Sequence, residues 1–200
     1  DKYENNIFLS KILNKYLMDS KEQINKYEIM WNRHKKYINP YEFIHTVIPQ
    51  YKQSIAKYKP LSRSFFKFIE ICNMLKLLDD VSYTHMDSFH LAEGPGGFIE
   101  ALSYLRKNTT DNYIGMTLID DTDVNVPGWK KTQSFLNKNP NVALEYGYTK
   151  NGDLLDPKNF VYIYEKYHNS MNMVTGDGGF DFSIDFNQQE SLSFKLIYVQ

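Results

Sequence analysis

Cysteine is nearly absent from the chain, because Cys72 is the single one among 200 residues. A lone cysteine cannot close a disulfide within the chain, and no potential ligand stands beside it at metal-binding spacing. We therefore expect Cys72 to be an ordinary core residue, and we expect no metal centre. A reducing intracellular location, cytoplasmic or nuclear, fits this composition best.

Long hydrophobic runs are also missing. No stretch approaches about 18 consecutive apolar residues, and residues 1–30 carry Lys, Asp and Glu throughout instead of the pattern of a signal peptide. The sequence therefore predicts neither a membrane span nor secretion. With 42% hydrophobic and 16% aromatic residues, the chain can bury one sizeable core. We expect a helical segment over residues 1–60 and a single domain over residues 61–200.

Net charge is small, at −1, but it is unevenly distributed. Residues 1–76 contain 14 Lys and Arg against 7 Asp and Glu, whereas residues 77–200 contain 9 against 17. A basic region favours a polyanionic partner, because binding releases the condensed counterions of the polyanion. The alternative is that these charges only solvate helix faces. Frequent Lys, Asn, Ile and Tyr suggest an A/T-rich coding sequence, as in some large DNA viruses or in protists. A viral source would place the protein in a viral factory.

Two kinds of hydrophobic spacing divide the chain. From Asn6 to about Asp79 apolar residues recur at helical intervals, with a turn at Asn39-Pro40 and Ser62 as the expected N-cap of a helix over residues 63–78. After Asp80, strand-like runs alternate with helical pieces. These segments are 88–92, 99–105, 113–119, 129–136, 142–146, 160–167, 171–175 and 190–200. The alternation predicts an α/β fold with a mostly parallel, Rossmann-like sheet flanked by helices.

Three of the ten glycines cluster in Gly94-Pro95-Gly96-Gly97-Phe98, between an expected strand and an expected helix. Glycine lets a backbone approach a ligand closely, and a helix start offers free N–H groups to an anion. A dinucleotide loop of the form G-x-G-x-x-G would have its third glycine where this chain has Ile99, which counts against NAD or FAD. The cluster therefore predicts a loop for another cofactor.

The cluster is one of a series of motifs. The others are Arg63-x-x-x-Lys67 upstream, then Glu100, Gly115-Met116-Thr117-Leu118, Gly152-Asp153-Leu154 and Thr175-Gly176-Asp177-Gly178-Gly179-Phe180. In order and spacing the series resembles the FtsJ-like and cap-specific RNA ribose 2′-O-methyltransferases, over roughly residues 61–200. The resemblance implies S-adenosylmethionine as cofactor and methyl transfer to a ribose 2′-OH near the 5′ cap of an mRNA. The partner that it implies is RNA, above all capped mRNA.

The resemblance also assigns site residues. It implies that Lys67 and Asp177 are two members of a Lys-Asp-Lys-Glu catalytic set. The residues that it places at the cofactor are Glu93, Gly94, Pro95, Gly96, Gly97, Phe98, Asp120 and Asp153. Asp177 follows an apolar strand, so its side chain should project from the carboxyl edge, where open α/β sheets bind ligands. Asp153 would accept from the adenine amino group, and Asp120 from the ribose hydroxyls of the cofactor.

Several positions have a plainer alternative. Asp177 and Asp153 are also turn aspartates of the kind that bond the following amides. Lys76 is the second choice for the catalytic lysine, and Asp121 the second choice for the acid at the cofactor ribose. Where FtsJ-like proteins commonly have an aspartate before the loop, this chain has His90, for which packing within a strand is favoured over metal binding. Glu93, the nearest acid, is then expected to take over a cofactor contact.

The remaining Lys and Glu of the catalytic set would lie past Gln200. We therefore expect the 200-residue chain alone to be weakly active or inactive. Two other functions stay open. One is a methyltransferase-like subunit that binds RNA or cofactor without turnover, and the other is a small-molecule or protein methyltransferase built on the same sheet.

Overall fold

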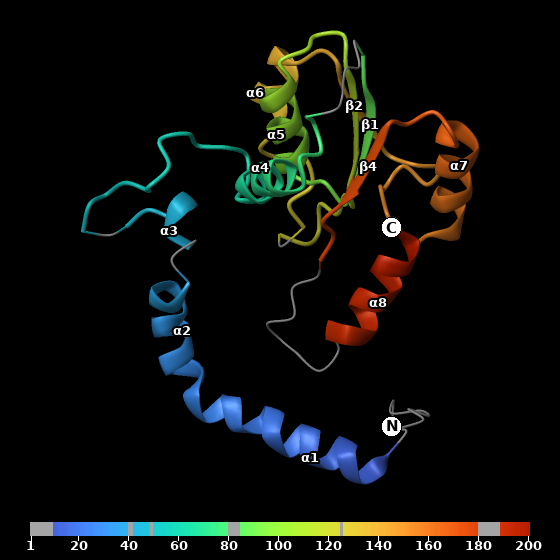
Figure 1. Cartoon of the computed structure of the whole chain (residues 1–200). Helices are drawn as coiled ribbons and strands as arrows, with labels where there is room; N and C mark the ends of the chain where they lie inside the picture. Colours follow the sequence, from blue (N-terminus) through green and yellow to red (C-terminus); the bar gives the residue numbers. More distant parts are fainter. Residues whose placement is uncertain (1–9, 40–41, 49, 80–84, 125, 180–188) are drawn as a thin grey trace. The chain divides into compact units, whose positions relative to one another are not determined.

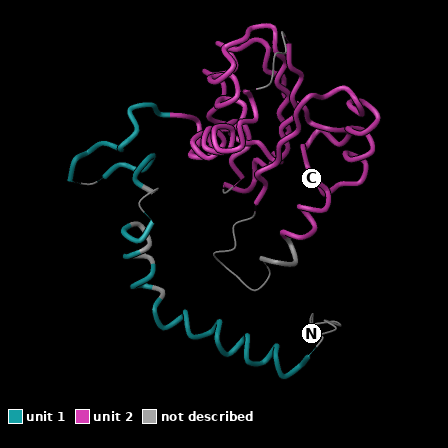
Figure 2. The backbone as a smooth tube through the Cα atoms, in the orientation of Figure 1, with its two compact units in different colours: residues 1–59 teal, residues 60–200 magenta. Residues whose placement is uncertain are grey.

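The computed structural model describes residues 10–39, 42–48, 50–79, 85–124, 126–179 and 189–200. The chain forms two compact units, residues 1–59 and residues 60–200 (Figure 2). Each unit has its own internal contacts. The predicted division into a helical segment over residues 1–60 and a methyltransferase domain over residues 61–200 stays a prediction.

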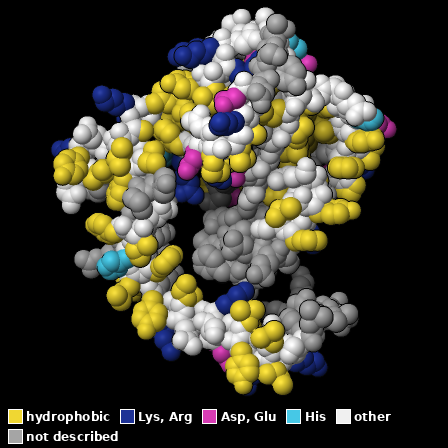
Figure 3. Space-filling model, in the orientation of Figure 1, with side chains coloured by type: hydrophobic (Ala, Val, Ile, Leu, Met, Phe, Trp, Pro, Cys, Tyr) yellow, Lys and Arg dark blue, Asp and Glu magenta, His cyan; other side chains and the backbone are white. Residues whose placement is uncertain are grey.

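The first unit is largely helical. Its helices are α1 (Lys11–Glu22), the short 3₁₀ helix η1 (Gln23–Tyr27), α2 (Glu28–Ile38) and α3 (Glu42–His45). Ser10 caps α1, because its hydroxyl accepts from the Leu13 amide at 3.2 Å. No residue of α1 is buried, and apolar side chains such as Leu13 and Tyr16 are exposed along it (Figure 3). The predicted turn at Asn39-Pro40 lies partly outside the described residues.

A four-stranded parallel sheet organises the second unit (Figure 1). Its strands are β1 (Asp87–Leu91), β2 (Asn112–Met116), β3 (Val142–Glu145) and β4 (Met173–Gly176). They lie in the order β3-β2-β1-β4, so the chain reverses direction across the sheet between β3 and β4. In such a sheet ligands bind at the carboxyl ends of the strands, beside the point where the order reverses. The predicted α/β fold with a parallel sheet is confirmed.

Helices connect and cover these strands. They are α4 (Ser64–Leu75), α5 (Gly97–Arg106), α6 (Gln133–Lys138), α7 (Pro157–Tyr167) and α8 (Gln189–Val199). Figure 1 shows α4 and α5 packed together on one face of the sheet and α7 on the other. Phe68 of α4 stacks on Phe98 of α5, with ring centroids 4.6 Å apart. This contact joins the helix before the first strand to the helix that follows the glycine cluster.

The core lies between this helix pair and the sheet. Its buried members are Phe65, Phe68, Cys72, Met86, Phe98, Ile99, Ala101, Leu102 and Tyr113. Cys72 is thus a core residue, as predicted, and burial raises the pKa of its thiol. His90 is fully buried in β1, where Nδ1 bonds the Thr175 hydroxyl at 2.7 Å and Nε2 bonds the Ser88 hydroxyl at 2.9 Å. Burial lowers the pKa of His90 to about 3, so its ring is neutral.

Some element boundaries differ from the sequence predictions. The strand expected over residues 113–119 ends at Met116, because the Ile119 amide donates to the Asn151 carbonyl of a loop instead of a neighbouring strand. Ser62 is not the N-cap of α4. That position is Arg63, whose backbone is already helical and which makes no side-chain cap bond. The Ser62 hydroxyl instead bonds the Ser64 hydroxyl. No helix in the described part of the chain is long and apolar enough to cross a membrane.

Candidate active site

The glycine cluster forms the turn between β1 and α5. Gly96 occupies the N-cap position of α5 with φ 113°, a conformation that side chains other than glycine rarely adopt. Its amide donates to the Glu93 carbonyl at 2.7 Å, which closes the turn. The Glu93 amide in turn donates to the Met116 carbonyl at 3.0 Å. The loop is therefore fixed at the carboxyl ends of β1 and β2, where the sequence predicts a cofactor loop.

Glu93 is buried beneath this loop and caps α5. Its Oε1 accepts from the amides of Phe98 at 2.8 Å and Ile99 at 2.9 Å. The sequence predicts that free amides of this helix start face a ligand, but these two are bound by the protein itself. Burial, with a smaller contribution from the charge of Asp177, raises the pKa of the Glu93 carboxyl to about 8, although the hydrogen bonds from the Ile99 and Phe98 amides oppose the shift. Glu93 thus lies close to Asp177, and its direct contact with cofactor stays a prediction.

Other residues of the cluster are closely packed by protein. A Cβ added to Gly94 would lie 2.7 Å from the Gly128 carbonyl oxygen and 2.8 Å from Thr117 Oγ1. A Cβ on Gly97 would lie 2.0 Å from Ser64 Oγ. The Pro95 carbonyl accepts from the buried Thr132 hydroxyl at 2.7 Å. The glycines therefore serve close packing of the loop, whatever they do for a ligand.

Lys67 and Asp177 form an ion pair across the second unit. Nζ of Lys67, on α4, lies 2.5 Å from Oδ1 of Asp177, which directly follows β4. Their side chains are 53% and 33% exposed, so solvent reaches both. Of the two lysines that the sequence offers, Lys67 makes this pair, whereas Lys76 is the exposed C-cap of α4, in a left-handed conformation. The structure thus brings together the two predicted catalytic residues.

The two glycines after Asp177 have different surroundings. A Cβ on Gly178 would lie 2.9 Å from the Ala92 Cβ and 2.8 Å from Leu196 Cδ2, so this glycine is packed between β1 and α8. Among the described residues, nothing lies within 4 Å of a Cβ added to Gly179. Of the two glycines, Gly178 is therefore the closely packed one.

The two predicted cofactor aspartates stand on separate loops of the same sheet edge. Asp120, after β2, accepts from the Thr122 amide at 2.8 Å and from the Thr122 hydroxyl at 2.6 Å. The hydrogen bond from the Thr122 hydroxyl is the main cause that lowers the pKa of Asp120. Asp153, after β3, accepts from the Leu155 amide at 2.9 Å. Both are turn aspartates and both are partly accessible, whereas Asp121 is exposed. Their contacts to a cofactor stay predictions.

Close approach of the loops that follow β2 and β3 depends on one glycine. Gly152 has φ 67°, and a Cβ on it would lie 1.8 Å from the Thr117 carbonyl oxygen. The Ile119 amide donates to the Asn151 carbonyl at 2.8 Å across the same junction. Asp120 and Asp153 are therefore held along one edge, on loops that adjoin each other. Acceptor carboxylates in this arrangement fit the hydroxyls and amino group of an adenosine.

Glu100 is buried and makes a hydrogen bond, although it is not among the predicted catalytic or cofactor-binding residues. It is 7% exposed in the first turn of α5, and its Oε2 accepts from the Leu61 amide at 2.7 Å. The available signal is its place in the glycine motif, two residues after Phe98. His90 does not take the place of the family's aspartate, because both nitrogens of its buried ring are hydrogen-bonded to the hydroxyls of Thr175 and Ser88. In the described part of the chain no three His, Cys, Asp or Glu residues form a potential metal site.

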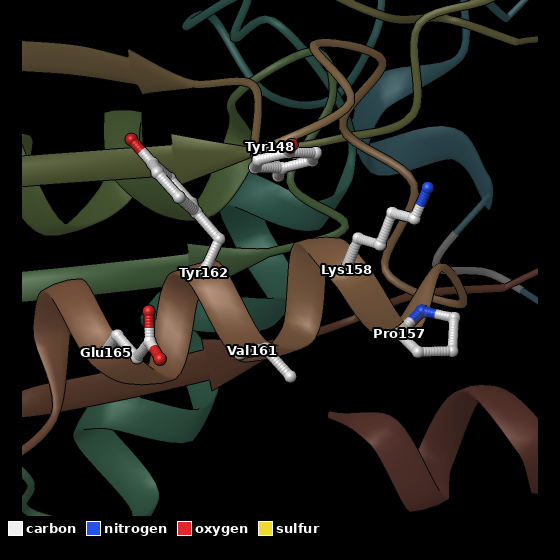
Figure 4. Close-up of a pocket in the computed structure, with 6 residues that line it drawn as sticks. All are labelled: Tyr148, Pro157, Lys158, Val161, Tyr162 and Glu165. Carbon is white, nitrogen blue, oxygen red and sulfur yellow. The ribbon is translucent and has the colours of Figure 1, made fainter.

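A cavity of about 450 Å³ opens elsewhere on the second unit, over α7. Its lining residues are Tyr148, Pro157, Lys158, Val161, Tyr162 and Glu165. Figure 4 shows Lys158 and Tyr162 extending from α7 on the side where Tyr148 lies. None of these residues is a predicted catalytic or cofactor residue, so the cavity is separate from the pair of Lys67 and Asp177.

Fold and site together define a class: a Rossmann-like sheet with a glycine-rich loop after its first strand and a lysine–aspartate pair at its carboxyl edge. The chain belongs to the FtsJ-like methyltransferase family, whose sequence model matches residues 60–200. Methyltransferases of this family use S-adenosylmethionine. The resemblance predicted from the motifs is therefore confirmed.

Two curated relatives add to this result. The chain is 26% identical over 185 residues to a cap-specific mRNA (nucleoside-2′-O-)-methyltransferase 2 of Danio rerio, covering 88% of this chain and 24% of the relative. It is 29% identical over 125 residues to a cap-specific mRNA (nucleoside-2′-O-)-methyltransferase 1A of Caenorhabditis briggsae, covering 58% of this chain and 14% of the relative. The chain thus spans a quarter or less of either relative. Neither is viral, and the suggested viral source finds no support.

Proposed function

We propose that this protein transfers the methyl group of S-adenosylmethionine to a ribose 2′-OH of RNA, next to the 5′ cap of an mRNA. The observation that carries the proposal is the ion pair of Lys67 and Asp177. It joins α4 to the end of β4, at the sheet edge that also carries the glycine loop, Asp120 and Asp153. The similarity to two cap-specific mRNA methyltransferases supports the choice of substrate.

The chain's own residues can bind and orient the reactants. Asp153 and Asp120 would hold the adenosine of the cofactor, each with carboxylate oxygen beyond its turn bond. When bound, S-adenosylmethionine supplies an electrophilic methyl group on its sulfonium. Asp177 fixes Lys67, whose ammonium has two further N–H donors to orient a ribose hydroxyl. No described residue lies within 4 Å of a Cβ added to Gly179, which supports an approach of the ribose on this side.

A methyl-transfer assay tests the proposal. The full-length protein is incubated with S-adenosylmethionine labelled in its methyl group and with three matched RNAs: capped, uncapped, and capped with a 2′-deoxy nucleotide at the position of transfer. Label should appear on the capped RNA and not on the 2′-deoxy RNA. Equal labelling of the 2′-deoxy RNA would show that the acceptor is not the ribose hydroxyl.

The same assay separates the other functions. Equal labelling of capped and uncapped RNA would support ribose methylation but would show that the cap is not part of the recognised substrate. If calorimetry showed cofactor binding while the full-length protein labelled no RNA, the protein would be a binding subunit, and the proposed reaction would be wrong. Transfer to a small molecule or a protein, with none to RNA, would also overturn it.

A further inference from the structure

We propose that Glu100 is a positioning residue for Lys67, an inference that rests on the proposed function of that lysine. Glu100 belongs to the first turn of α5, where its side chain is buried. Its Oε2 accepts at 2.7 Å from the backbone N–H of Leu61, a residue 39 positions earlier in the chain. The carboxylate therefore ties the first turn of α5 to the segment that leads into α4.

The segment that leads into α4 sets the backbone position from which the Lys67 side chain extends. Leu61 lies three positions before α4, and Lys67 lies in the first turn of the helix. Each residue along an α-helix rotates the side-chain direction by about 100°. A small change in the entry of the chain into α4 would therefore turn the Lys67 side chain away from Asp177. Lys67 is 53% exposed and its Nζ pairs with Asp177, so the helix backbone sets the point from which the side chain reaches that carboxylate.

Two further contacts show that α4 is held on α5 at one register. Ser64 lies so close to Gly97 that a Cβ on the glycine would be 2.0 Å from Ser64 Oγ. Phe68, next to Lys67, stacks on Phe98 with ring centroids 4.6 Å apart. Glu100 adds the third point of attachment, on the same stretch of α5. The stretch from Gly97 to Glu100, which continues the glycine loop into α5, thus also holds the lysine-bearing helix in place.

A hydrogen-bonding role and a charge role predict opposite results for two conservative changes. Glu100→Gln keeps an acceptor oxygen at the same reach but removes the charge. Glu100→Asp keeps the charge but withdraws it by one C–C bond, about 1.5 Å. For a positioning role, kcat should stay within about threefold of wild type in Glu100→Gln and fall by about tenfold or more in Glu100→Asp. The reverse order would overturn the proposal, as would two unaffected variants.

Cofactor binding distinguishes this role from damage to the glycine loop. The dissociation constant for S-adenosylmethionine, measured by calorimetry, should stay within about twofold of wild type in Glu100→Asp, and the KM for cofactor should not rise. If the affinity fell in parallel with kcat, Glu100 would act on the loop and not on Lys67. Thermal unfolding of both variants shows whether the comparison is made between folded proteins.

A double-mutant cycle with Lys67→Gln tests whether Glu100 acts through the lysine. Lys67→Gln should lower kcat, and adding Glu100→Asp to it should lower kcat by less than about twofold more. Two losses that multiply would overturn the positioning role while leaving the proposed function intact. If Lys67→Gln alone left kcat unchanged, the proposed function of Lys67 would fail, whatever Glu100 does.

Discussion

Lys67 and Asp177 are separated by 110 positions in the sequence, and their side-chain atoms Nζ and Oδ1 lie 2.5 Å apart. We expect Lys67→Gln and Asp177→Asn each to lower kcat by about 100-fold or more, the usual scale for loss of a group that handles a proton or orients its acceptor. Because both side chains are partly exposed, the unfolding free energy should fall by less than about 1 kcal/mol. The measurements are methyl transfer to capped RNA and urea unfolding.

Lys76→Gln is the matched control for this prediction. Lys76 also belongs to α4 but is its exposed C-cap. Its replacement should leave kcat within about twofold of wild type, because it takes no part in the proposed orientation of substrate. Equal losses in Lys67→Gln and Lys76→Gln would mean that general positive charge near the RNA matters, and not the pair with Asp177.

Glu93 should make stability depend on pH. Burial raises the pKa of its carboxyl from 4.5 to about 8, so the folded protein holds the proton more tightly than the unfolded chain does. Stability from this group is therefore fully present below about pH 4.5 and is lost as pH rises toward about 8. The total loss is about 5 kcal/mol, at 1.36 kcal/mol for each pKa unit between 4.5 and about 8.

Glu93→Gln should remove this dependence. The amide oxygen can accept from the same amides of Phe98 and Ile99, and the side chain has no proton to lose. Urea unfolding at pH 5 and pH 8.5 should then show a smaller decrease for the variant than for wild type, with the exposed Glu165→Gln as control. The same decrease in variant and wild type would show that Glu93 does not titrate in this range.

Gly152→Ala and Gly179→Ala form a contrasting pair. A Cβ on Gly152 would lie 1.8 Å from the Thr117 carbonyl oxygen, at a residue with φ 67°. We expect Gly152→Ala to destabilise the fold by about 2–4 kcal/mol, through backbone strain and overpacking. The added Cβ of Gly179→Ala meets no described residue within 4 Å, so this variant should change stability by less than about 0.5 kcal/mol.

Activity gives the second half of this comparison. If RNA enters the space beside Gly179, Gly179→Ala should raise the KM for RNA while the protein remains fully folded. Denaturant midpoints and initial rates at varied RNA concentration measure the two effects. An unchanged KM in Gly179→Ala would place the RNA elsewhere, and an unchanged midpoint in Gly152→Ala would contradict the close approach of the two loops.

Asp153 can be tested for cofactor binding without disturbing its turn. Asp153→Asn keeps the oxygen that accepts from the Leu155 amide, but it replaces the other oxygen with an N–H donor. If that oxygen accepts from the adenine amino group, the dissociation constant for S-adenosylmethionine should rise by about tenfold, which is 1.4 kcal/mol. Asp121→Asn, at an exposed position on the neighbouring loop, is the control in the same calorimetric titration. Equal affinities of both variants would contradict the role of Asp153.

The sequence by itself determined the order and kind of the elements in the second unit. Alternating strand-like and helical runs predicted the parallel sheet, and the strand expected over residues 88–92 is β1, at Asp87–Leu91. The glycine cluster was placed correctly between that strand and α5. These features follow from side-chain spacing and from backbone conformations that few residues other than glycine adopt, so they can be read within a short window of sequence.

Only the tertiary structure decided which side chains meet. The choice of Lys67 over Lys76 depends on the register of α4 on α5 and on the position of β4 beside β1, neither of which is written in local spacing. The same holds for Glu93, which binds the amides of its own helix, and for Glu100, which reaches back to Leu61. A carboxylate near a glycine loop can bind a ligand, a helix end or another segment. Which of these partners the carboxylate binds depends on its burial and on the nearest hydrogen-bond donor. Both are set by the packing of distant parts of the chain.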